Sequence, residues 1–327
     1  MSNNTNKKRV LVIQPLHAAG MAMLEQRDDI EIIQCDSLDE DVIAEAAKDV
    51  HAMTVRAAKI TKRIMDAAPD LMVVSRHGVG YDAVDLNTLT QRNIPLCIAV
   101  HSNMISVAEQ AMALLLGLAK DMFYYDDVTR RDGWPNRWPT RAVDIDGKKI
   151  LIVGFGRIGS QVAKRALGFD MQVYGYDPYI DQKIMTDAGV EPVSNYNSVL
   201  GDMDAVAIHC MKTTETTNMF STEQFQKMKS DAFLVNCARG GIVDEDALHS
   251  ALTSGEIRAA GLDVLLDEPS SADHPLFKLK NIILSPHIAG VTVESTQRMA
   301  TQTVDNVLRV FDGNIDPDCV VNSDVLK

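Results

Sequence analysis

The sequence predicts an α/β protein built from two doubly wound parallel-sheet lobes. Three observations lead to this prediction: the length of the chain, its alternating pattern and one glycine-rich turn. The 327 residues are enough for two domains of roughly 100–200 residues each. Short β-branched runs alternate with amphipathic segments in two separate stretches, and the second stretch contains GFGRIG (154–159). Buried strands that alternate with helices are typical of a parallel sheet covered on both faces.

The first stretch contains five expected strands. They are VLVI (10–13), IEII (30–33), AMTV (52–55), LMVVS (71–75) and PLCIA (95–99). The segments between them carry the apolar spacing of helices. Residues 102–121 then predict one long helix that is apolar almost all round. We therefore expect this helix to be buried between domains or at a subunit interface.

A segment of low periodicity, residues 123–147, follows the long helix and contains both tryptophans. It is too long and too aromatic for a simple linker. We expect it to form an arm that packs against another surface, with a second subunit as one candidate.

The second stretch contains six expected strands with helical connections between most of them. They are KILIVG, MQVYGYD, AVAIHC, AFLVNC, AAGLDV and NIILSP. Together they predict a second doubly wound unit. A final long helix is expected over residues 291–312, and it should end at Gly313 because glycine is a common helix stop.

Composition excludes several classes of protein. The net charge is −13, and a nucleic-acid partner would need a basic surface that this chain lacks. The 5 cysteines are scattered without a CxxC pair, which indicates a reducing compartment and no zinc ribbon. The longest strongly apolar stretch, residues 111–119, is far shorter than the roughly 20 residues that span a bilayer. We expect a cytoplasmic protein without a metal or membrane partner.

The glycine-rich turn predicts a dinucleotide site of the Rossmann type. Such a turn alone is weak evidence, but this one follows an apolar strand and opens a helix. Gly154 would permit the tight turn, Gly156 would let backbone approach a pyrophosphate, and Gly159 would allow close helix–strand packing. Asp177 follows 23 residues after Gly154, where a carboxylate accepts hydrogen bonds from ribose hydroxyls. Since Asp177 would repel a 2′-phosphate, we expect NAD(H) rather than NADP(H).

Eight histidines compete for the role of proton carrier. Four of them show no further signal and are expected at the surface: His17, His51, His249 and His274. His77, His101 and His209 lie near strand ends. His287 directly follows an expected strand within SPHIAG, at the carboxyl edge where open α/β sheets bind ligands. We therefore favour His287.

Two charged residues also follow strands. Arg239 lies in LVNCARGG, where the two glycines would hold backbone close to a ligand. Glu268 precedes Pro269 just beyond another strand. From its spacing alone, Glu268 is better explained as an ordinary loop carboxylate than as a site residue.

Several motifs in register resemble one known family. VGFGRIG, Asp177, VNCARGGIVDEDAL, GLDVLLDEP and LSPHIAG are similar, in this order and spacing, to the D-isomer-specific 2-hydroxyacid dehydrogenases. Upstream, RHGVGYDAVDL (76–86) and SVAEQAM (106–112) match the family's substrate loop and inter-domain helix. The resemblance covers nearly the whole chain and is strongest to the phosphoglycerate dehydrogenase and hydroxypyruvate reductase branch. Because the chain ends at Lys327, we expect no carboxy-terminal regulatory domain.

The resemblance implies an oxidoreductase that works as a homodimer through its cofactor lobe. Residues 1–101 and 291–327 would form a discontinuous substrate-binding domain, and residues 102–290 an NAD-binding Rossmann domain. The active site would lie in the cleft between the two lobes.

The resemblance also implies roles for individual residues. His287 would be the acid/base, Glu268 would hydrogen-bond its imidazole, and Arg239 would grip the substrate carboxylate and carbonyl. A neighbouring carboxylate favours the protonated ring and fixes which nitrogen faces the substrate. The implied cofactor-binding residues are Gly154, Gly156, Arg157, Ile158, Gly159, Asp177, Cys210, Cys237, Asp263 and Gly290. The implied substrate-binding residues are Arg56, Gly78, Val79, Gly80 and Arg239. Asp263 would contact the nicotinamide carboxamide, and neither cysteine would be a nucleophile.

The substrate is less constrained. The hypothesis is a 2-hydroxy or 2-oxo acid with a second anionic group at C3, of the 3-phosphoglycerate or 3-sulfolactate type, read by Arg56 or by Arg137 and Arg141 of the arm. Solvated arm arginines are the equally supported alternative. A hydroxypyruvate or glyoxylate reductase remains open, and so does an NAD(H)-sensing, corepressor-like interaction protein.

Overall fold

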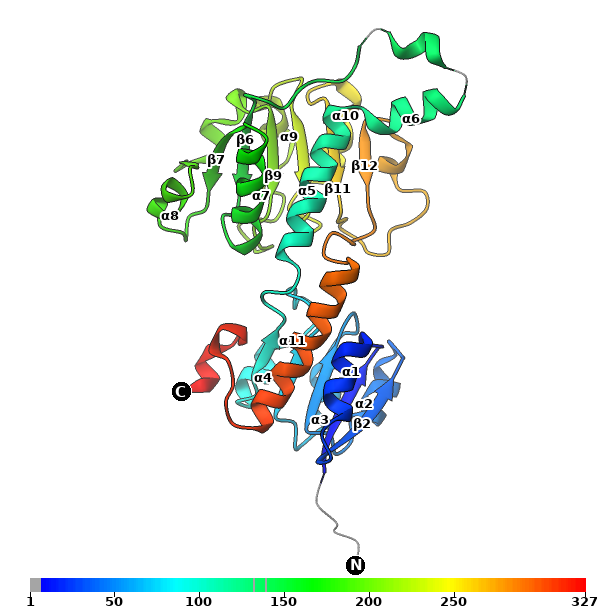
Figure 1. Cartoon of the computed structure of the whole chain (residues 1–327), viewed down its shortest axis with the longest axis vertical. Coiled ribbons are helices and arrows are strands. Elements are labelled where there is room, and N and C mark those ends of the chain that lie inside the picture. The colour runs from blue at the N-terminus through cyan, green and yellow to red at the C-terminus, as the bar shows by residue number, and fades with distance from the viewer. Residues whose placement is uncertain (1–6, 132, 139) are drawn as a thin grey trace, which may run out of the picture. The chain divides into compact units, whose positions relative to one another are not determined.

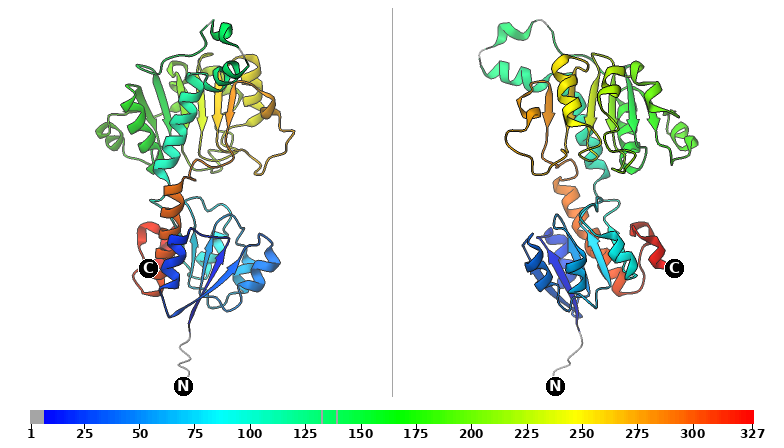
Figure 2. Two further views of the ribbon diagram at one scale, coloured as in Figure 1. Left: turned by 45° about the vertical axis from the view of Figure 1, so that its right-hand side comes forward. Right: turned by 180° about the vertical axis from the view of Figure 1, so that it is seen from behind.

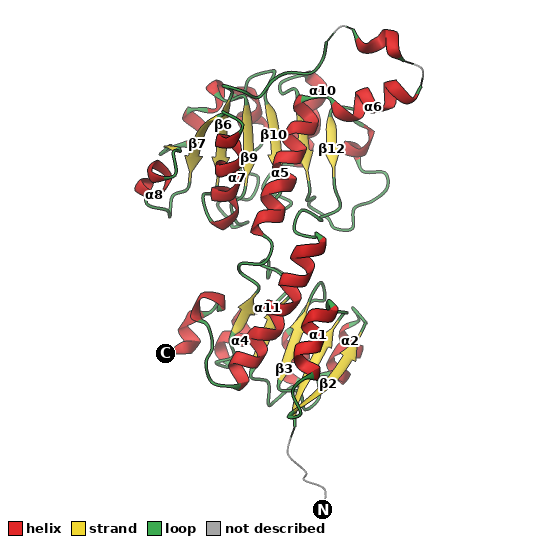
Figure 3. Ribbon diagram, in the orientation of Figure 1, coloured by secondary structure: helices red, strands yellow, loops and turns green. Residues whose placement is uncertain are grey.

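The computed structural model describes residues 7–131, 133–138 and 140–327. The chain divides into two compact units, the first formed by Met1–Asn103 with Val291–Lys327 and the second by Met104–Gly290. Each unit is an α/β layer structure around one parallel sheet (Figures 1 and 3). The predicted fold class is thus confirmed. Among the described residues, no helix is both long and apolar enough to cross a membrane.

The first unit contains a five-stranded parallel sheet in the order β2-β1-β3-β4-β5. Its strands are β1 (Lys8–Ile13), β2 (Ile30–Cys35), β3 (Ala52–Val55), β4 (Val73–Arg76) and β5 (Leu96–Ile98). Its helices are α1 (Ala18–Glu25), α2 (Glu40–Ala46), α3 (Lys62–Asp66), α4 (Leu86–Gln91) and α11 (Val293–Phe311), followed by short 3₁₀ turns at Pro317–Cys319 and Ser323–Leu326. The five β-branched runs of the sequence correspond to these strands. Residues of all five contribute to the core, and β2, at the edge of the sheet, also has exposed residues, Glu31 and Gln34.

Helix α11 returns the chain to the first unit and packs along α1 and the strands β3 to β5. It begins with a capping box, in which the Thr292 side chain accepts from Ser295 N and the Ser295 side chain accepts from Thr292 N. Its inward face contributes Val304 and Val307 to the core. Gly20 of α1 is required here, because a Cβ at Gly20 would lie 2.8 Å from the Ala300 carbonyl oxygen.

The second unit contains a seven-stranded parallel sheet in the order β12-β11-β10-β9-β6-β7-β8. Its strands are β6 (Lys149–Val153), β7 (Gln172–Tyr176), β8 (Glu191–Pro192), β9 (Ala205–Ile208), β10 (Phe233–Asn236), β11 (Ala259–Leu262) and β12 (Ile282–Leu284). Its helices are α5 (Met104–Ala119), α6 (Met122–Arg130), α7 (Arg157–Gly168), α8 (Gln182–Asp187), α9 (Thr222–Lys227) and α10 (Glu245–Ser254). Short 3₁₀ helices lie at Trp134–Arg137, Tyr196–Ser198, Leu200–Asp202 and Pro275–Lys278. The two-residue strand β8 was not expected, since so short a run has no period.

The chain reverses direction across this sheet at β6. Strand β6 pairs with β7 on one side and with β9 on the other, both in parallel register. The connection after β6 leads to β7, and the connection after β9 leads to β10 on the opposite side, which opens a crevice beyond the carboxyl ends of β6 and β9. This crevice is where a doubly wound sheet binds its ligand.

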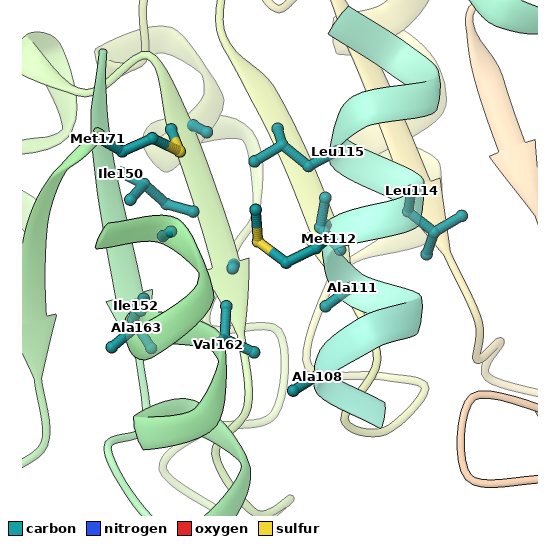
Figure 4. Packing of buried hydrophobic residues seen from close by; sticks show 14 of the residues in the cluster. Ala108, Ala111, Met112, Leu114, Leu115, Ile150, Ile152, Val162, Ala163 and Met171 are labelled. Carbon is teal, nitrogen blue, oxygen red and sulfur yellow. The ribbon is translucent and has the colours of Figure 1, made fainter. Parts of the chain in front are cut away.

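Helices cover both faces of the seven-stranded sheet. Helices α5 and α7 lie on one face, and α10 lies on the other (Figure 2). Figure 4 shows Ala108 and Met112 of α5 facing Val162 of α7. Leu114 points toward β11, where a Cβ at Gly261 would lie 3.0 Å from the Leu114 Cβ. Each such buried aliphatic side chain contributes roughly 1.5–3 kcal/mol to stability.

Two expectations about residues 102–147 need correction. The apolar helix α5 is buried against its own sheet and α7, whereas we expected it between domains or subunits. An all-round apolar pattern shows that a helix is buried but does not show by what. The segment after it is not simply irregular, because residues 122–130 form helix α6. Its signal was the i,i+4 charge pairing, seen in the 2.8 Å contact between Asp126 and Arg130.

Candidate active site

The glycine turn joins β6 to α7 at the crevice. Gly154 has a φ of +94°, and a Cβ there would lie 2.5 Å from Cys210 N of the neighbouring strand end. A Cβ at Gly159 would lie 2.0 Å from the Gly154 carbonyl oxygen. Glycine is therefore required at both positions. A Cβ at Gly156, in contrast, would meet nothing within 4 Å.

The open space at Gly156 fits a dinucleotide. Gly156 is the N-cap of α7, and no side chain caps this helix end. The first backbone N–H groups of a helix without a cap are available to an anion, and the helix dipole favours negative charge there. Arg157 is exposed and Ile158 is half-buried at the start of α7. The open space at Gly156 and the uncapped start of α7 thus fit the approach of a pyrophosphate.

Asp177 lies directly after β7 and faces the glycine turn. Its Oδ2 accepts a hydrogen bond from Phe155 N at 2.9 Å, and its Oδ1 accepts from Tyr179 N at 2.9 Å. These two bonds fix the carboxylate beside the turn and leave lone pairs for further donors. The sequence predicted Asp177 in this neighbourhood, although it gave no indication of the bond to Phe155.

His287 and Glu268 form a close pair. His287 Nδ1 lies 2.5 Å from Glu268 Oε2, and the two side chains are 47% and 37% exposed. His287 has a φ of +54°, a conformation that costs energy for a residue with a Cβ. The backbone N–H of His287 stabilises this conformation by donating to the Asp263 carbonyl oxygen at 2.8 Å. The backbone therefore presents the imidazole at the carboxyl edge of the sheet.

Glu268 is held as a carboxylate. Burial alone would raise the pKa of Glu268, but the hydrogen bonds from His287 and from Leu265 N, together with the charge of Arg239, bring it below its ordinary value. The Leu265 N–H donates to Glu268 Oε1 at 3.0 Å. One oxygen of Glu268 is thus fixed by backbone and the other faces the imidazole.

Asp263 has a structural role that the sequence did not indicate. It is buried, and its Oδ1 accepts from Ser285 Oγ at 2.5 Å and from Ile288 N at 3.0 Å, while its Oδ2 accepts from Ala289 N at 2.8 Å. These bonds fix the loop that carries His287. The expected contact with a nicotinamide carboxamide stays a prediction.

Arg239 follows β10 on the same edge of the sheet. Its carbonyl oxygen accepts from Asn236 Nδ2 at 3.0 Å, and its Nη1 donates to the Ala238 carbonyl oxygen at 2.7 Å. A Cβ at Gly240 would lie only 1.8 Å from the Leu265 carbonyl oxygen. The Arg239 turn therefore packs directly on the segment that leads to Glu268.

Burial favours the protonated thiol form of the two cysteines at this edge. Burial raises the pKa of Cys210 to about 11 and also raises the pKa of Cys237. Since the thiolate is the nucleophile, neither side chain is suited to covalent chemistry. Gly290 ends the His287 loop and is half-buried.

The expected substrate-binding residues of the first unit gather at the carboxyl ends of β3 and β4. Arg56 is exposed directly after β3, and the next residue donates its N–H to Gln14 Oε1 at 2.6 Å. Gly78 has a φ of +126°, and its carbonyl oxygen accepts from Ala99 N at 2.9 Å. Val79 and Gly80 are half-buried beside it.

The structure adds Arg76 and His77 to this group. The Arg76 guanidinium donates to the His77 carbonyl oxygen and lies 3.1 Å from where a Gly78 Cβ would be. Burial and the charges of Arg76 and Arg56 lower the pKa of His77 to about 4. The RHGVG motif contained both residues, but only the fold shows that Arg76 turns back over the glycine turn.

The arginines of the arm differ in their surroundings. Arg141 pairs with Asp121, and its guanidinium lies 4.2 Å from the centre of the Tyr124 ring. Arg137 lies 6.0 Å from the Trp134 ring. Trp134 and Trp138 are 65% and 67% exposed, so the described residues of this chain do not cover them. Asp132 and Pro139 of the arm lie outside the described residues.

One expectation about a histidine is wrong. His274 was expected at the surface, yet its side chain is only 18% exposed and its Nε2 lies 3.0 Å from Glu245 Oε2. The two residues are far apart in sequence, so no local pattern indicated their contact.

Comparisons with known proteins agree with these features. The family model for the D-isomer specific 2-hydroxyacid dehydrogenase, NAD binding domain, matches residues 112–289. A D-3-phosphoglycerate dehydrogenase of Methanocaldococcus jannaschii is 36% identical over 308 residues, which are 94% of this chain and 58% of the relative. A glyoxylate reductase of Korarchaeum cryptofilum is 35% identical over 326 residues, which are 98% of each chain.

A solved structure of a Thermus thermophilus protein superposes with a TM-score of 0.85 at 32% identity, covering 96% of this chain and 99% of that one. The chain spans only 58% of the length of the phosphoglycerate dehydrogenase that it matches. The family model covers more than half of the chain, and the glyoxylate reductase matches it from end to end. The chain therefore belongs to the D-isomer specific 2-hydroxyacid dehydrogenase family, as its motifs predicted.

Proposed function

We propose that the protein is an NAD-dependent oxidoreductase that interconverts a small 2-hydroxy acid and its 2-oxo acid. The observation that carries this proposal is the 2.5 Å contact between His287 Nδ1 and Glu268 Oε2 at the ligand-binding edge of the sheet. A carbonyl reduction needs one proton for the carbonyl oxygen, and an imidazole beside a fixed carboxylate is suited to deliver it. The nicotinamide, when bound, supplies or accepts the hydride.

The contact with Glu268 supports separate tasks for the two imidazole nitrogens. Because Nδ1 is held by Glu268, Nε2 is the atom that would exchange a proton with the substrate. In reduction, Nε2–H donates its proton to the carbonyl oxygen, and in oxidation Nε2 removes the 2-hydroxyl proton. Glu268 stabilises the imidazolium that forms and keeps the ring in one orientation.

Arg239 supplies the positive charge that this chemistry needs. Its planar guanidinium suits a carboxylate and a polarised carbonyl oxygen. The backbone of Gly78, Val79 and Gly80 and the side chain of Arg56 would bind the anionic end of the substrate.

The substrate we favour carries a second anionic group at C3, such as phosphate or sulfonate. The positive charges of Arg76 and Arg56 both lower the pKa of His77, so two positive charges lie near the Gly78 turn. Arg141 is a weaker candidate, because Asp121 already neutralises it. The glyoxylate reductase relative supports a singly charged substrate instead, so hydroxypyruvate and glyoxylate are the second candidates.

The test is a substrate panel. kcat/KM would be measured with NADH for 3-phosphohydroxypyruvate, 3-sulfopyruvate, hydroxypyruvate and glyoxylate, with the wild type and with Arg56→Ala, Arg137→Ala and Arg141→Ala. We expect the doubly charged substrates to react best and Arg56→Ala to reduce that advantage. If the singly charged acids react best and no variant matters, the second-anion proposal is wrong.

The same assay separates an enzyme from an NAD(H)-sensing interaction protein. A sensing protein would bind NADH without turning over any acid of the panel. The fixed imidazole–carboxylate pair favours the enzyme, since a sensor has no use for a proton carrier.

We also propose a homodimer formed through the second unit. Support comes from the exposed aromatic side chains of the arm, Phe123, Trp134 and Trp138, since large apolar side chains exposed on one segment are candidates for an interaction surface. Light scattering on the full chain should give twice the monomer mass, and Trp134→Ser with Trp138→Ser should shift it toward the monomer.

A further inference from the structure

The second unit contains another histidine–glutamate pair, close in sequence to the first. His274 Nε2 lies 3.0 Å from Glu245 Oε2, and these side chains are 18% and 15% exposed. The His287–Glu268 pair is far more open. The second pair is therefore less accessible to solvent than the first.

Both ring nitrogens of His274 are already used. Its Nδ1 accepts the Leu276 N–H at 3.3 Å, so this nitrogen carries no proton. The proton is then on Nε2 and is donated to Glu245. A ring with both nitrogens engaged cannot exchange protons with a substrate, so the pair has a different use from the first one.

Glu245 also binds the segment that leads to Glu268. Its Oε1 accepts the Leu266 N–H at 2.6 Å, and the preceding amide, Leu265 N–H, donates to Glu268 Oε1 at 3.0 Å. Two consecutive amides are thus held by two carboxylates. One of these carboxylates is Glu245, and the other is the partner of His287.

Glu245 is itself firmly placed. It is the first residue of α10, whose N-cap Asp244 accepts from Ala247 N at 3.1 Å and from Ser221 Oγ at 2.9 Å. On the other side, the Leu265 carbonyl oxygen packs against Gly240. The segment 265–268 therefore lies between a helix start and the Arg239 turn, and Glu245 is its hydrogen-bonded tether.

We propose that Glu245 and His274 are positioning residues that hold segment 265–268 so that Glu268 stays on Nδ1 of His287. His274 acts by fixing the Glu245 carboxylate through Nε2 and by fixing the following turn through Nδ1. The kinetic part of this inference rests on the proposed function, whereas its structural part concerns only residues of this chain.

The structural part is tested by NMR on the full chain with ¹⁵N-labelled histidine and without cofactor. The low-field signal of the His287 ring N–H that faces Glu268 is identified by its loss in His287→Gln and its shift in Glu268→Gln. We expect Glu245→Ala to move this signal toward its position in Glu268→Gln. Asp246→Ala is the matched control, because Asp246 is exposed on the same helical turn and should leave the signal in place. An unchanged signal in Glu245→Ala would overturn the proposal.

The kinetic part is tested by a double-mutant cycle. Glu245→Ala should lower kcat about tenfold, the size expected for losing one charged hydrogen bond, while the Kd for NADH measured by fluorescence stays unchanged. In a Glu268→Gln background the same substitution should lower kcat by less than about twofold, because residues that act through one another are not additive. A full, additive effect in that background would show that Glu245 does not act through Glu268.

Two substitutions of His274 keep the test decisive if Glu245→Ala folds poorly. The amide of His274→Gln can still reach Glu245, whereas His274→Asn retains only the acceptor for Leu276 N–H. We expect His274→Gln to preserve more of kcat and more of the His287 signal than His274→Asn. The opposite order would exclude the route through Glu245. If the wild type turns over no 2-oxo acid, the proposed function fails, but the NMR comparison still decides whether the tether exists.

Discussion

The two units share an architecture but differ in the chemistry at their sheet edges. In each sheet the chain reverses direction at its first strand, β1 or β6, and polar groups follow the carboxyl ends of other strands. Arg239, Glu268 and His287 follow β10, β11 and β12, and Arg56 follows β3. The second unit presents an imidazole paired with a carboxylate and a glycine turn without a cap. The first unit presents Arg56, Arg76 and the Gly78 turn. We therefore propose that proton transfer depends on the second unit and recognition of the C3 anion on the first, so substitution of His287 should affect mainly kcat and substitution of Arg56 mainly KM.

The largest effect is expected from His287→Gln in the second unit. Removal of a general acid/base lowers the rate by on the order of 10²–10⁴. kcat with NADH and the best oxo acid should fall by this amount, while the Kd for NADH is retained. A variant with wild-type kcat would show that His287 is not the proton carrier and that the proposed difference between the two units is wrong.

A second prediction uses one buried histidine from each unit. Burial lowers the pKa of His77 and of His209 from 6.5 to about 4, and the described residues offer no hydrogen-bond partner to His77 Nε2 or to either His209 ring nitrogen. The unfolded chain binds protons at these sites below about pH 6.5, whereas the folded chain does so only near pH 4. The stability that the two neutral histidines provide is complete above pH 6.5 and is lost as the pH falls toward 4.

For each histidine, lowering the pH from 7.5 to 5 should therefore reduce the free energy of unfolding by about 2 kcal/mol. Urea unfolding at both pH values measures this loss. His77→Gln should flatten the pH dependence of the first unit, and His209→Gln that of the second. A variant that keeps the full pH dependence would show that its histidine is not the titrating group.

Arg56→Ala in the first unit should act on KM. A hydrogen bond to a charged group contributes about 1.5–3 kcal/mol, so the KM for a doubly charged oxo acid should rise about 10–100-fold with little change in kcat. Arg63→Ala is the matched control, because Arg63 is an exposed arginine that already pairs with Asp41. An equal fall in kcat would place Arg56 in the chemical step and would break the division between the units.

The smallest effect is expected at Asp177, which sharpens the comparison within the second unit. Removing its charge in Asp177→Ala takes away a repulsion of about 1 kcal/mol toward a 2′-phosphate. The ratio of kcat/KM for NADH over NADPH should fall severalfold through the KM of the cofactor. A ratio that does not change would mean that other groups select the cofactor.

Local patterns were enough to predict the parts of the site that depend on one strand and the turn after it. Gly154, Gly159 and Asp177 were predictable because a tight turn and a strand end impose their residue types. The pairing of His287 with Glu268 followed from the family resemblance, since spacing alone favoured an ordinary loop carboxylate for Glu268.

The long-range hydrogen bonds were not predictable in the same way. Asp263 binds Ile288 and Ala289, and Glu245 binds Leu266 and His274, across separations that only the strand order brings together. Helix α6 was missed because its stability signal is charge pairing rather than an apolar stripe. The periodicity of apolar residues indicates burial and local geometry. The long-range hydrogen bonds of Asp263 and Glu245 depend instead on which strand ends become neighbours in the folded sheet.

The most direct test of the central claim follows the hydride itself. The full chain would be incubated with NADH dideuterated at C4 of the nicotinamide and each oxo acid of the panel, and the product analysed by mass spectrometry and chiral chromatography. We predict a 2-hydroxy acid of D configuration that carries deuterium at C2. Absence of deuterium from every product, with NADH bound to the protein, would contradict the account.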